Sequence, residues 1–224
     1  MLQRTVLRRA VPILSSSWLC CNPSTSTQQQ NFGRVEPKMK HEIQQNRNIR
    51  WPGHFWLLKI WNQYDKQRVK AIGSDRAAAQ WVIRNGGSVK WQHSSDFTDN
   101  YDRVMADIDR KEYQLEAIKA VDASLYWTGF EYLAGCTDVR SIWLESCPDI
   151  NDVALKQIAD HVADSLQHLT VLNCAITDEG LKHHVVRLSN LKRLRVAHCA
   201  HVKDLTSCRQ VLSEKMKSTE IAVD

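Results

Sequence analysis

The sequence predicts an α/β fold, a short solenoid of stacked strand-and-helix repeats that is capped by a small, mostly helical N-terminal domain. Three observations indicate it. An apolar pattern recurs in the second half, helical periodicity fills the intervals between its copies, and a tryptophan-rich segment precedes them. At 224 residues, 43% hydrophobic and 25% charged, the chain has the composition of a globular protein.

The repeat is visible as three matched stretches. Each places apolar residues at offsets 0, 3 and 5 and a cysteine at offset 8, and the stretches begin 27 and 25 residues apart. They are Val139, Ile142, Leu144 and Cys147; Leu166, Leu169, Val171 and Cys174; and Leu191, Leu194, Val196 and Cys199. This is the cysteine-containing leucine-rich repeat, in which a short strand turns alternate residues inward. One repeat cannot bury its apolar side by itself, so neighbouring repeats must stack.

A helix should follow each strand and return along the opposite side of the solenoid. Apolar residues at helical spacing mark its buried face. They are Leu155, Ile158 and Val162 after the first strand and Leu181, Val185 and Leu188 after the second. We expect Asp152, Asp178 and Asp204 to cap the helix N-termini, since a carboxylate accepts from the free N–H groups there.

The two ends of the repeat array are less regular. A fourth frame precedes the others, and two registers fit it. In one, Leu115, Ile118, Ala120 and Ala123 occupy the repeat positions; in the other, the frame starts at Ile118 and Val121 and Ala123 point inward. At the other end, we expect a last helix from Leu205 to Met216 and a capping strand within residues 218–224.

Residues 36–110 are expected to form the helical capping domain, and residues 111–224 the repeats. The pattern from His54 to Ile72 predicts one helix with Phe55, Leu58 and Trp61 on its apolar face. A second helix should be N-capped by Ser74 and end at Gly86, the expected left-handed residue after its C-terminus. A strand at 88–92 and a polar loop at 96–109 complete the domain.

Residues 1–35 have the composition of a mitochondrial transit peptide. They contain Arg4, Arg8, Arg9 and Arg34 but no acidic residue, and they are rich in Ser, Thr and Gln. A secretory signal with residues 10–19 as its apolar region is the alternative. Removing these four charges from the net +5 leaves +1, which gives no electrostatic argument for nucleic-acid binding.

Catalytic and membrane-spanning signals are lacking in the sequence. It has no Walker loop, dinucleotide-binding glycine motif or zinc-protease motif, and no apolar run of about 18 residues. The cysteines form no C-x-x-C pair, and three of them occupy one repeat position, which favours buried thiols over disulfides or zinc. We therefore expect a protein that is not an enzyme and has no small-molecule substrate.

Specific stretches resemble the factor B (subunit s) family of mitochondrial ATP synthase. Residues 64–86 read YDKQRVKAIGSDRAAAQWVIRNG, and residues 120–124 read AVDAS. The resemblance covers residues 52–224. A related group, the distal membrane-arm assembly component of respiratory complex I, resembles the second half, where residues 164–169 read DSLQHL and residues 211–216 read VLSEKM.

The resemblance implies a non-enzymatic protein on the matrix side of the mitochondrial inner membrane. It would associate peripherally with the membrane sector of ATP synthase and support proton-coupled ATP synthesis. The family's magnesium site carries over to the main-chain oxygen of Gly86 and to Ser124, where the family has Thr. Oxygen donors suit Mg²⁺, with water filling the other positions. The alternative reading of these two residues is a helix C-cap and a polar turn.

Partner contacts are expected on the face of the strands and on the basic, Trp-bearing helix at 54–71. The exposed positions between the inward residues are Arg140, Trp143, Gln167, Thr170, Arg193 and Arg195. An alternative function is assembly of the complex I distal membrane arm. A further alternative is substrate recognition by a ubiquitin ligase, because that class also uses cysteine-type repeats.

Overall fold

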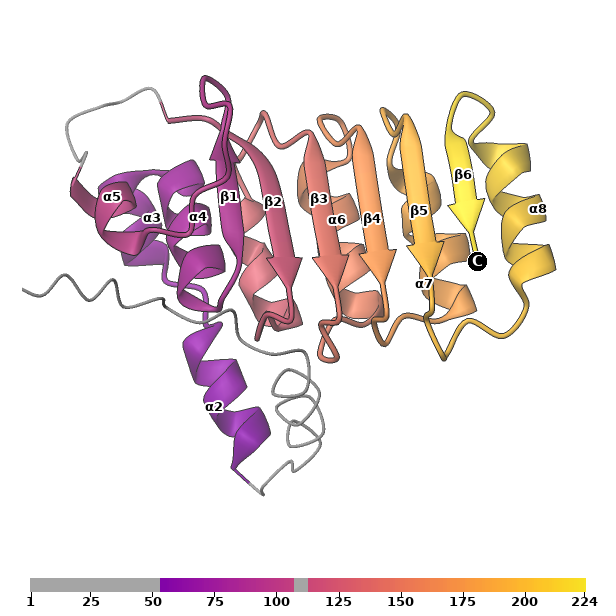
Figure 1. Ribbon diagram of the computed structural model, residues 1–224, viewed down its shortest axis with the longest axis horizontal. Coiled ribbons are helices and arrows are strands. Elements are labelled where there is room, and N and C mark those ends of the chain that lie inside the picture. Colours follow the sequence, from indigo (N-terminus) through magenta and orange to yellow (C-terminus); the bar gives the residue numbers. More distant parts are fainter. Residues whose placement is uncertain (1–52, 107–112) are drawn as a thin grey trace, which may run out of the picture. The chain divides into compact units, whose positions relative to one another are not determined.

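The computed structural model describes residues 53–106 and 113–224, which lie in the unit formed by Arg50–Asp224 (Figure 1). The expectations for residues 1–35 and for the parts of the capping domain at residues 36–52 and 107–110 fall outside this part. The described chain is α/β, and its sheet has six strands in the order in which they occur in the sequence. They are β1 (Ser88–Trp91), β2 (Leu115–Val121), β3 (Ser141–Glu145), β4 (His168–Leu172), β5 (Arg193–Ala197) and β6 (Glu220–Val223). β1 runs antiparallel to β2, and β2–β6 are parallel.

The strand register follows the apolar pattern of the sequence. Ile142 pairs with Leu169, and Leu169 pairs with Leu194, so equivalent positions of the three matched stretches lie side by side and buried. Ile118 of β2 continues this row as the partner of Ile142. The first of the two registers weighed for β2 is therefore confirmed. The other is wrong, because Val121 is 39% exposed rather than turned inward.

A left-handed residue ends each of the strands β2–β5. Asp122, Ser146, Asn173 and His198 have φ between 50° and 57°, and each immediately precedes the cysteine position of its stretch. Their N–H groups donate to the next strand, as in Ser146 N to Leu172 O at 2.9 Å and Asn173 N to Ala197 O at 3.0 Å. Asp, Asn and His tolerate this conformation better than most residues. Ala123 therefore takes the place that cysteine has in the later copies.

The three cysteines of the repeat position are buried packing residues. Cys147, Cys174 and Cys199 each lie within hydrogen-bond distance of a carbonyl two residues earlier, at 3.3, 3.3 and 3.5 Å. Burial raises the pKa of Cys174 to about 12, so its thiol stays protonated at neutral pH. Buried, protonated thiols are poor nucleophiles and poor metal ligands.

Helical segments cover one face of the sheet. Figure 1 shows α6 (Asp152–Val162) and α7 (Asp178–His183) behind the strands. The short 3₁₀ helices η1 (Trp127–Leu133) and η2 (Val185–Arg187) and the last helix α8 (Leu205–Lys215) complete these returns. All six apolar residues expected at the buried helix faces after β3 and β4 are buried. The predictions for α8 and β6 are also confirmed.

Two of the three predicted aspartate caps are wrong. Asn151, not Asp152, caps α6, and the Asp152 carboxylate instead accepts from Thr177 N at 2.8 Å in the next return segment. Asp178 likewise accepts from Asp204 N at 3.0 Å. Only Asp204 acts as predicted, accepting from Ser207 N at 2.9 Å. The first two carboxylates therefore connect successive repeats rather than cap their own helices.

The helix expected from His54 to Ile72 is two helices, α2 (His54–Trp61) and α3 (Lys66–Ile72). Asp65 starts α3 by accepting from Gln67 N and Arg68 N, which satisfies N–H groups that a continuous helix would have paired internally. Of the predicted apolar face, Leu58 is buried, while Phe55 and Trp61 are about half exposed.

The other predictions for this segment are confirmed only in part. α4 (Ser74–Arg84) begins at Ser74, but its N-cap is Gly73, so Ser74 is not the cap. Gly86 has the predicted left-handed conformation, with φ of 88°, and β1 is the expected strand. The polar loop contains the short helix α5 (Tyr101–Ala106), which the sequence reading missed.

Acid should weaken the link between the last two repeats. The Lys203 N–H that donates to Asp178 is the main cause that lowers the pKa of this carboxyl to about 2, from an ordinary 3.8. The unfolded chain then binds more protons than the folded chain as the pH falls from about 4 to about 2, so stability is lost in this window. Asp178→Asn should lower the unfolding free energy at pH 7 by about 1–2 kcal/mol and flatten this acid dependence.

Chemical denaturation at a series of pH values measures both effects. Asp99→Asn, at an exposed loop residue, is the matched control and should leave the acid dependence unchanged. An unaltered slope in Asp178→Asn would show that the carboxylate does not link the repeats.

Candidate functional site

A buried polar cluster surrounds Asn62, at the end of α2. Asn62 is fully buried, and its Oδ1 accepts from Trp81 Nε1 at 2.7 Å and from Tyr126 N at 3.0 Å. Its Nδ2 lies 2.9 Å from Leu58 O and 3.1 Å from Ser124 O. One amide therefore joins α2, α4 and the segment between β2 and η1.

Close packing around Trp81 fixes the same junction. Phe130 makes an edge-to-face contact with the Trp81 ring at a centroid distance of 5.1 Å, and Tyr132 stacks on it at 6.0 Å. A Cβ at Gly129 would lie 2.2 Å from the Trp81 indole, so no side chain fits there. Because η1 approaches α4 this closely, the segment that precedes η1 is held next to the end of α4.

The two residues of the expected magnesium site are neighbours at this junction. Ser124 N donates to Asn85 O at 2.9 Å, and Asn85 immediately precedes Gly86. Gly86 and Ser124 are both exposed, and no described hydrogen bond uses the Gly86 carbonyl or the Ser124 hydroxyl. A main-chain oxygen and a hydroxyl are oxygen donors of the kind that Mg²⁺ accepts, with water at its other positions. Over residues 53–106 and 113–224, no group of three or more His, Cys, Asp or Glu side chains forms a candidate metal site.

The residues expected to contact a partner occupy the outer face and the entry edge of the sheet. Trp143, Thr170 and Arg195 form one row across β3, β4 and β5. Arg193 lies in the adjacent row, beside His168. Arg140 and Gln167 lie one residue before β3 and β4. Their main-chain groups form hydrogen bonds between the first residues of neighbouring strands, as in Gln167 N to Arg140 O.

Two further residues of this face were missed by the sequence reading. Lys119 of β2 extends the row of Trp143, with its Nζ 5.6 Å from the indole centroid. His168 lies between Ser141 and Arg193, and burial lowers its pKa, as do the nearby charges of Arg193 and Lys192. The alternation of inward and outward residues along each strand could have found both, because they fall at the same outward positions.

Another surface is formed by α2. Its exposed large apolar residues are Phe55 (49% exposed), Trp56 (66%), Ile60 (42%) and Trp61 (55%). They surround Lys59 in the sequence, and Arg84 of α4 donates to Trp61 O at 2.9 Å. Within the described residues, no helix is long and apolar enough to cross a membrane.

Known proteins resemble this chain over most of its length. The protein named ATP synthase subunit s, mitochondrial, from Rattus norvegicus is 30% identical over 176 residues, which are 75% of this chain and 85% of the rat chain. The chain belongs to the ATP synthase subunit s family. The subunit s of Bos taurus is 27% identical over 175 residues, with the same shares of both chains. No family profile matches the chain.

A second, weaker similarity extends beyond the subunit s family. The protein named Distal membrane arm assembly component 2, from Drosophila melanogaster, is 24% identical over 193 residues, which are 84% of this chain and 64% of the fly chain. Both resemblances predicted from the sequence are therefore confirmed, and the one to the subunit s family is the stronger.

Replacement of Asn62 should destabilise this member of the subunit s family strongly. Asn62→Leu keeps the size of the side chain but leaves the buried Trp81 Nε1 and Tyr126 N without an acceptor. The unfolding free energy should fall by about 3 kcal/mol or more. Urea denaturation followed by tryptophan fluorescence measures it. Gln114→Leu, at an exposed residue, is the control and should change stability little. A loss below about 1 kcal/mol for Asn62→Leu would contradict the central role of this amide.

Proposed function

We propose that this chain is a non-enzymatic mitochondrial protein that binds the membrane sector of ATP synthase on the matrix side and supports proton-coupled ATP synthesis. The observation that carries the proposal is its membership of a family whose relatives are named as subunits of this enzyme. A noncatalytic role agrees with the buried, protonated state of Cys174 and with polar groups in the repeats that bind main-chain N–H groups of neighbouring segments. The ubiquitin-ligase alternative gains no support from these relatives.

The architecture that serves this function is a leucine-rich-repeat solenoid of the cysteine-containing type. Its support is the common register of β2–β5, the left-handed residue that ends each of these strands, and the carboxylates that connect successive returns. Helices α2–α5 with β1 form its N-terminal cap, because β1 pairs antiparallel with the first repeat strand and α4 packs on both strands and on η1. We place the boundaries of the transit peptide, cap and repeats near residues 35 and 110.

The outer face of the sheet is the proposed contact surface for the membrane sector. Trp143 offers an aromatic surface in its centre, and its indole donates to Glu145 at 2.9 Å. Arg195 is exposed in the same row, on the far side of Thr170, and no ion pair of Arg195 occurs among the described residues. Aromatic and arginine side chains supply much of the binding energy at protein interfaces. Arg193 is already paired with Glu220 at 3.0 Å, so we expect it to contribute less.

Peripheral attachment to the inner membrane would use α2. Trp side chains are favoured at the boundary between lipid headgroups and acyl chains, and basic residues are attracted to anionic lipids. The exposed Trp56 and Trp61 with Lys59 between them have this chemistry. An eight-residue helix can rest in this boundary but cannot span the bilayer.

Assembly of the distal membrane arm of complex I is the second candidate function. The observation that favours it is the similarity to the fly assembly component, which extends over more of this chain than the similarity to subunit s does. The lower identity, 24% against 30%, places it second.

We also propose a weak Mg²⁺ site at Gly86 and Ser124. Bound there, the ion would join the end of α4 to the segment after β2. The Asn62 amide already connects these two segments.

Affinity purification of the tagged chain from gently solubilised mitochondria tests the main proposal. The wild-type chain should enrich ATP synthase membrane-sector subunits. The double substitution Trp143→Ala with Arg195→Glu should reduce this enrichment about tenfold or more, because it removes an aromatic contact and reverses a charge. Lys156→Glu, a charge reversal on the exposed side of α6, is the matched control. Enrichment of complex I intermediates instead would replace the main proposal with the second candidate.

Thermal unfolding with and without Mg²⁺ tests the metal proposal. Mg²⁺ in roughly tenfold excess over its dissociation constant should stabilise the wild-type chain by about 1.4 kcal/mol. Ser124→Ala should remove this gain, whereas Ser124→Thr should keep it because the hydroxyl remains. An equal gain with Ser124→Ala would place the ion elsewhere.

A further inference from the structure

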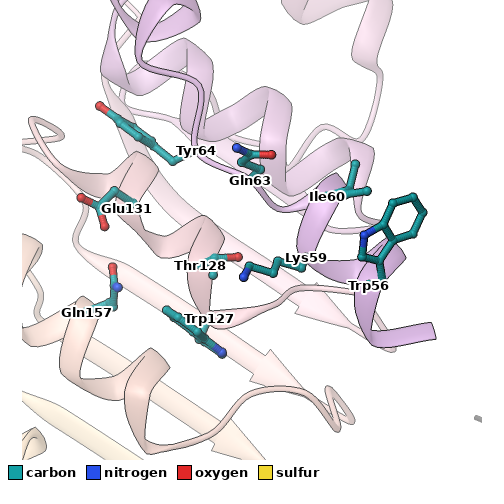
Figure 2. A pocket seen from close by; sticks show the side chains of 9 residues that line it. All are labelled: Trp56, Lys59, Ile60, Gln63, Tyr64, Trp127, Thr128, Glu131 and Gln157. Atoms are coloured by element: carbon teal, nitrogen blue, oxygen red, sulfur yellow. The ribbon is translucent and has the colours of Figure 1, made fainter. Parts of the chain in front are cut away.

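A cavity of about 460 Å³ lies between α2, η1 and α6. Figure 2 shows its side chains, with Gln157, Glu131 and Trp127 toward one end and Ile60 and Trp56 of α2 toward the other. No sequence pattern indicates this cavity, because its residues range from Trp56 to Gln157 along the chain and come together only in the fold. The function proposed above assigns no role to Gln157, Glu131 or Trp127.

The Gln157 amide is the most informative group in the cavity. Its Oε1 atom is buried and has no hydrogen-bond donor in the described structure. A buried acceptor without a donor destabilises the fold that contains it. The cost is avoided if an incoming ligand brings a donor to this oxygen.

The neighbouring groups specify a positively charged donor. Glu131 contributes a carboxylate to the same cavity, and no ion pair of Glu131 occurs within residues 53–106 and 113–224. Trp127 contributes an indole, whose face attracts cations. An orphan acceptor, a carboxylate and an aromatic ring together suit an alkylammonium or guanidinium group.

The opposite side of the cavity restricts the rest of the ligand. Lys59 would repel a second cation but can donate to a carbonyl oxygen, such as the main-chain carbonyl that accompanies every residue of a peptide. Trp56 and Ile60 are exposed beside it and would cover apolar neighbours in such a peptide. These features fit a segment of protein better than a free polyamine, which carries several positive charges and no carbonyl.

We propose that this cavity receives one arginine or lysine side chain from an otherwise apolar segment of a partner protein. The cation is bound by Glu131, Gln157 Oε1 and the Trp127 indole, while Lys59 binds a main-chain carbonyl of the same segment. The inference deepens the proposed function, on which the identity of the partner rests, by giving the chemistry of a second contact apart from the sheet face.

The cavity chemistry can be measured on the full purified chain with a small probe. Nα-acetylarginine amide carries the guanidinium and the carbonyl groups, and Nα-acetylnorleucine amide is its uncharged counterpart. In ¹⁵N-resolved NMR spectra, the arginine probe should shift the Trp127 indole signal, and the shift should saturate as the probe concentration rises. The signal is assigned by its loss in Trp127→Phe. The norleucine probe should not. Equal shifts with both probes, or no saturable shift with the arginine probe, overturn the proposal.

Two variants separate binding from folding. Glu131→Gln should weaken the arginine probe about fivefold or more, since it removes a charge-assisted hydrogen bond. Glu214→Gln, at an exposed glutamate of α8, is its matched control and should bind as the wild-type chain does. Gln157→Met should also weaken binding, yet its midpoint of thermal unfolding should stay equal or rise because the orphan acceptor is gone. A lower midpoint would show that the Gln157 amide serves the fold rather than a ligand.

The result is independent of the copurification experiment. If the arginine probe binds but no ATP synthase subunits are recovered, the proposed function fails while the cavity chemistry stands. If ATP synthase is recovered but the probe does not bind, the cavity proposal alone fails.

Discussion

The hydrogen-bond network of Asn62 is the constraint on which the N-terminal half of this structure depends. One buried amide accepts from Trp81 and Tyr126 and donates toward Leu58 and Ser124. An amide can satisfy donors and acceptors at once, which no apolar residue of the same size can do. The network therefore sets where α2 ends, how closely η1 approaches α4, and how Ser124 lies beside Gly86. The cavity next to α2 depends on the same junction.

A different constraint governs the repeats, where each unit is tied to the next at several points. The strands share one register, a left-handed residue donates across to the following strand, and Asp152 and Asp178 bind main-chain N–H groups of the following return. A Cβ at Gly180 would lie 2.2 Å from the Asp152 carboxylate, so this glycine makes room for the link. Each repeat is thus stabilised by contacts with its neighbours in the chain.

The proposed contacts use three surfaces of the described chain, namely the sheet face around Trp143, the exposed side of α2, and the cavity lined by Gln157. They differ in chemistry. The first is aromatic and basic, the second is apolar with Lys59, and the third combines Lys59 with the Glu131 carboxylate and an orphan acceptor. The second and third surfaces share Trp56, Lys59 and Ile60, so only the sheet face can be altered without changing another of these surfaces.

The sequence by itself determined the α/β class, the register of β3–β5 and the buried faces of α6 and α7. These follow from local spacing, because alternation by two residues or by helical turns decides which side chains face inward. It did not determine the break after α2, the partners of Asp152 and Asp178, or the cavity. Asn62 meets Tyr126 and Asp152 meets Thr177 only after folding, and an aspartate before a helix looks the same whether it caps its own helix or binds the next repeat. Only the tertiary structure decides between such uses, because the competing donors come from segments far away in the chain.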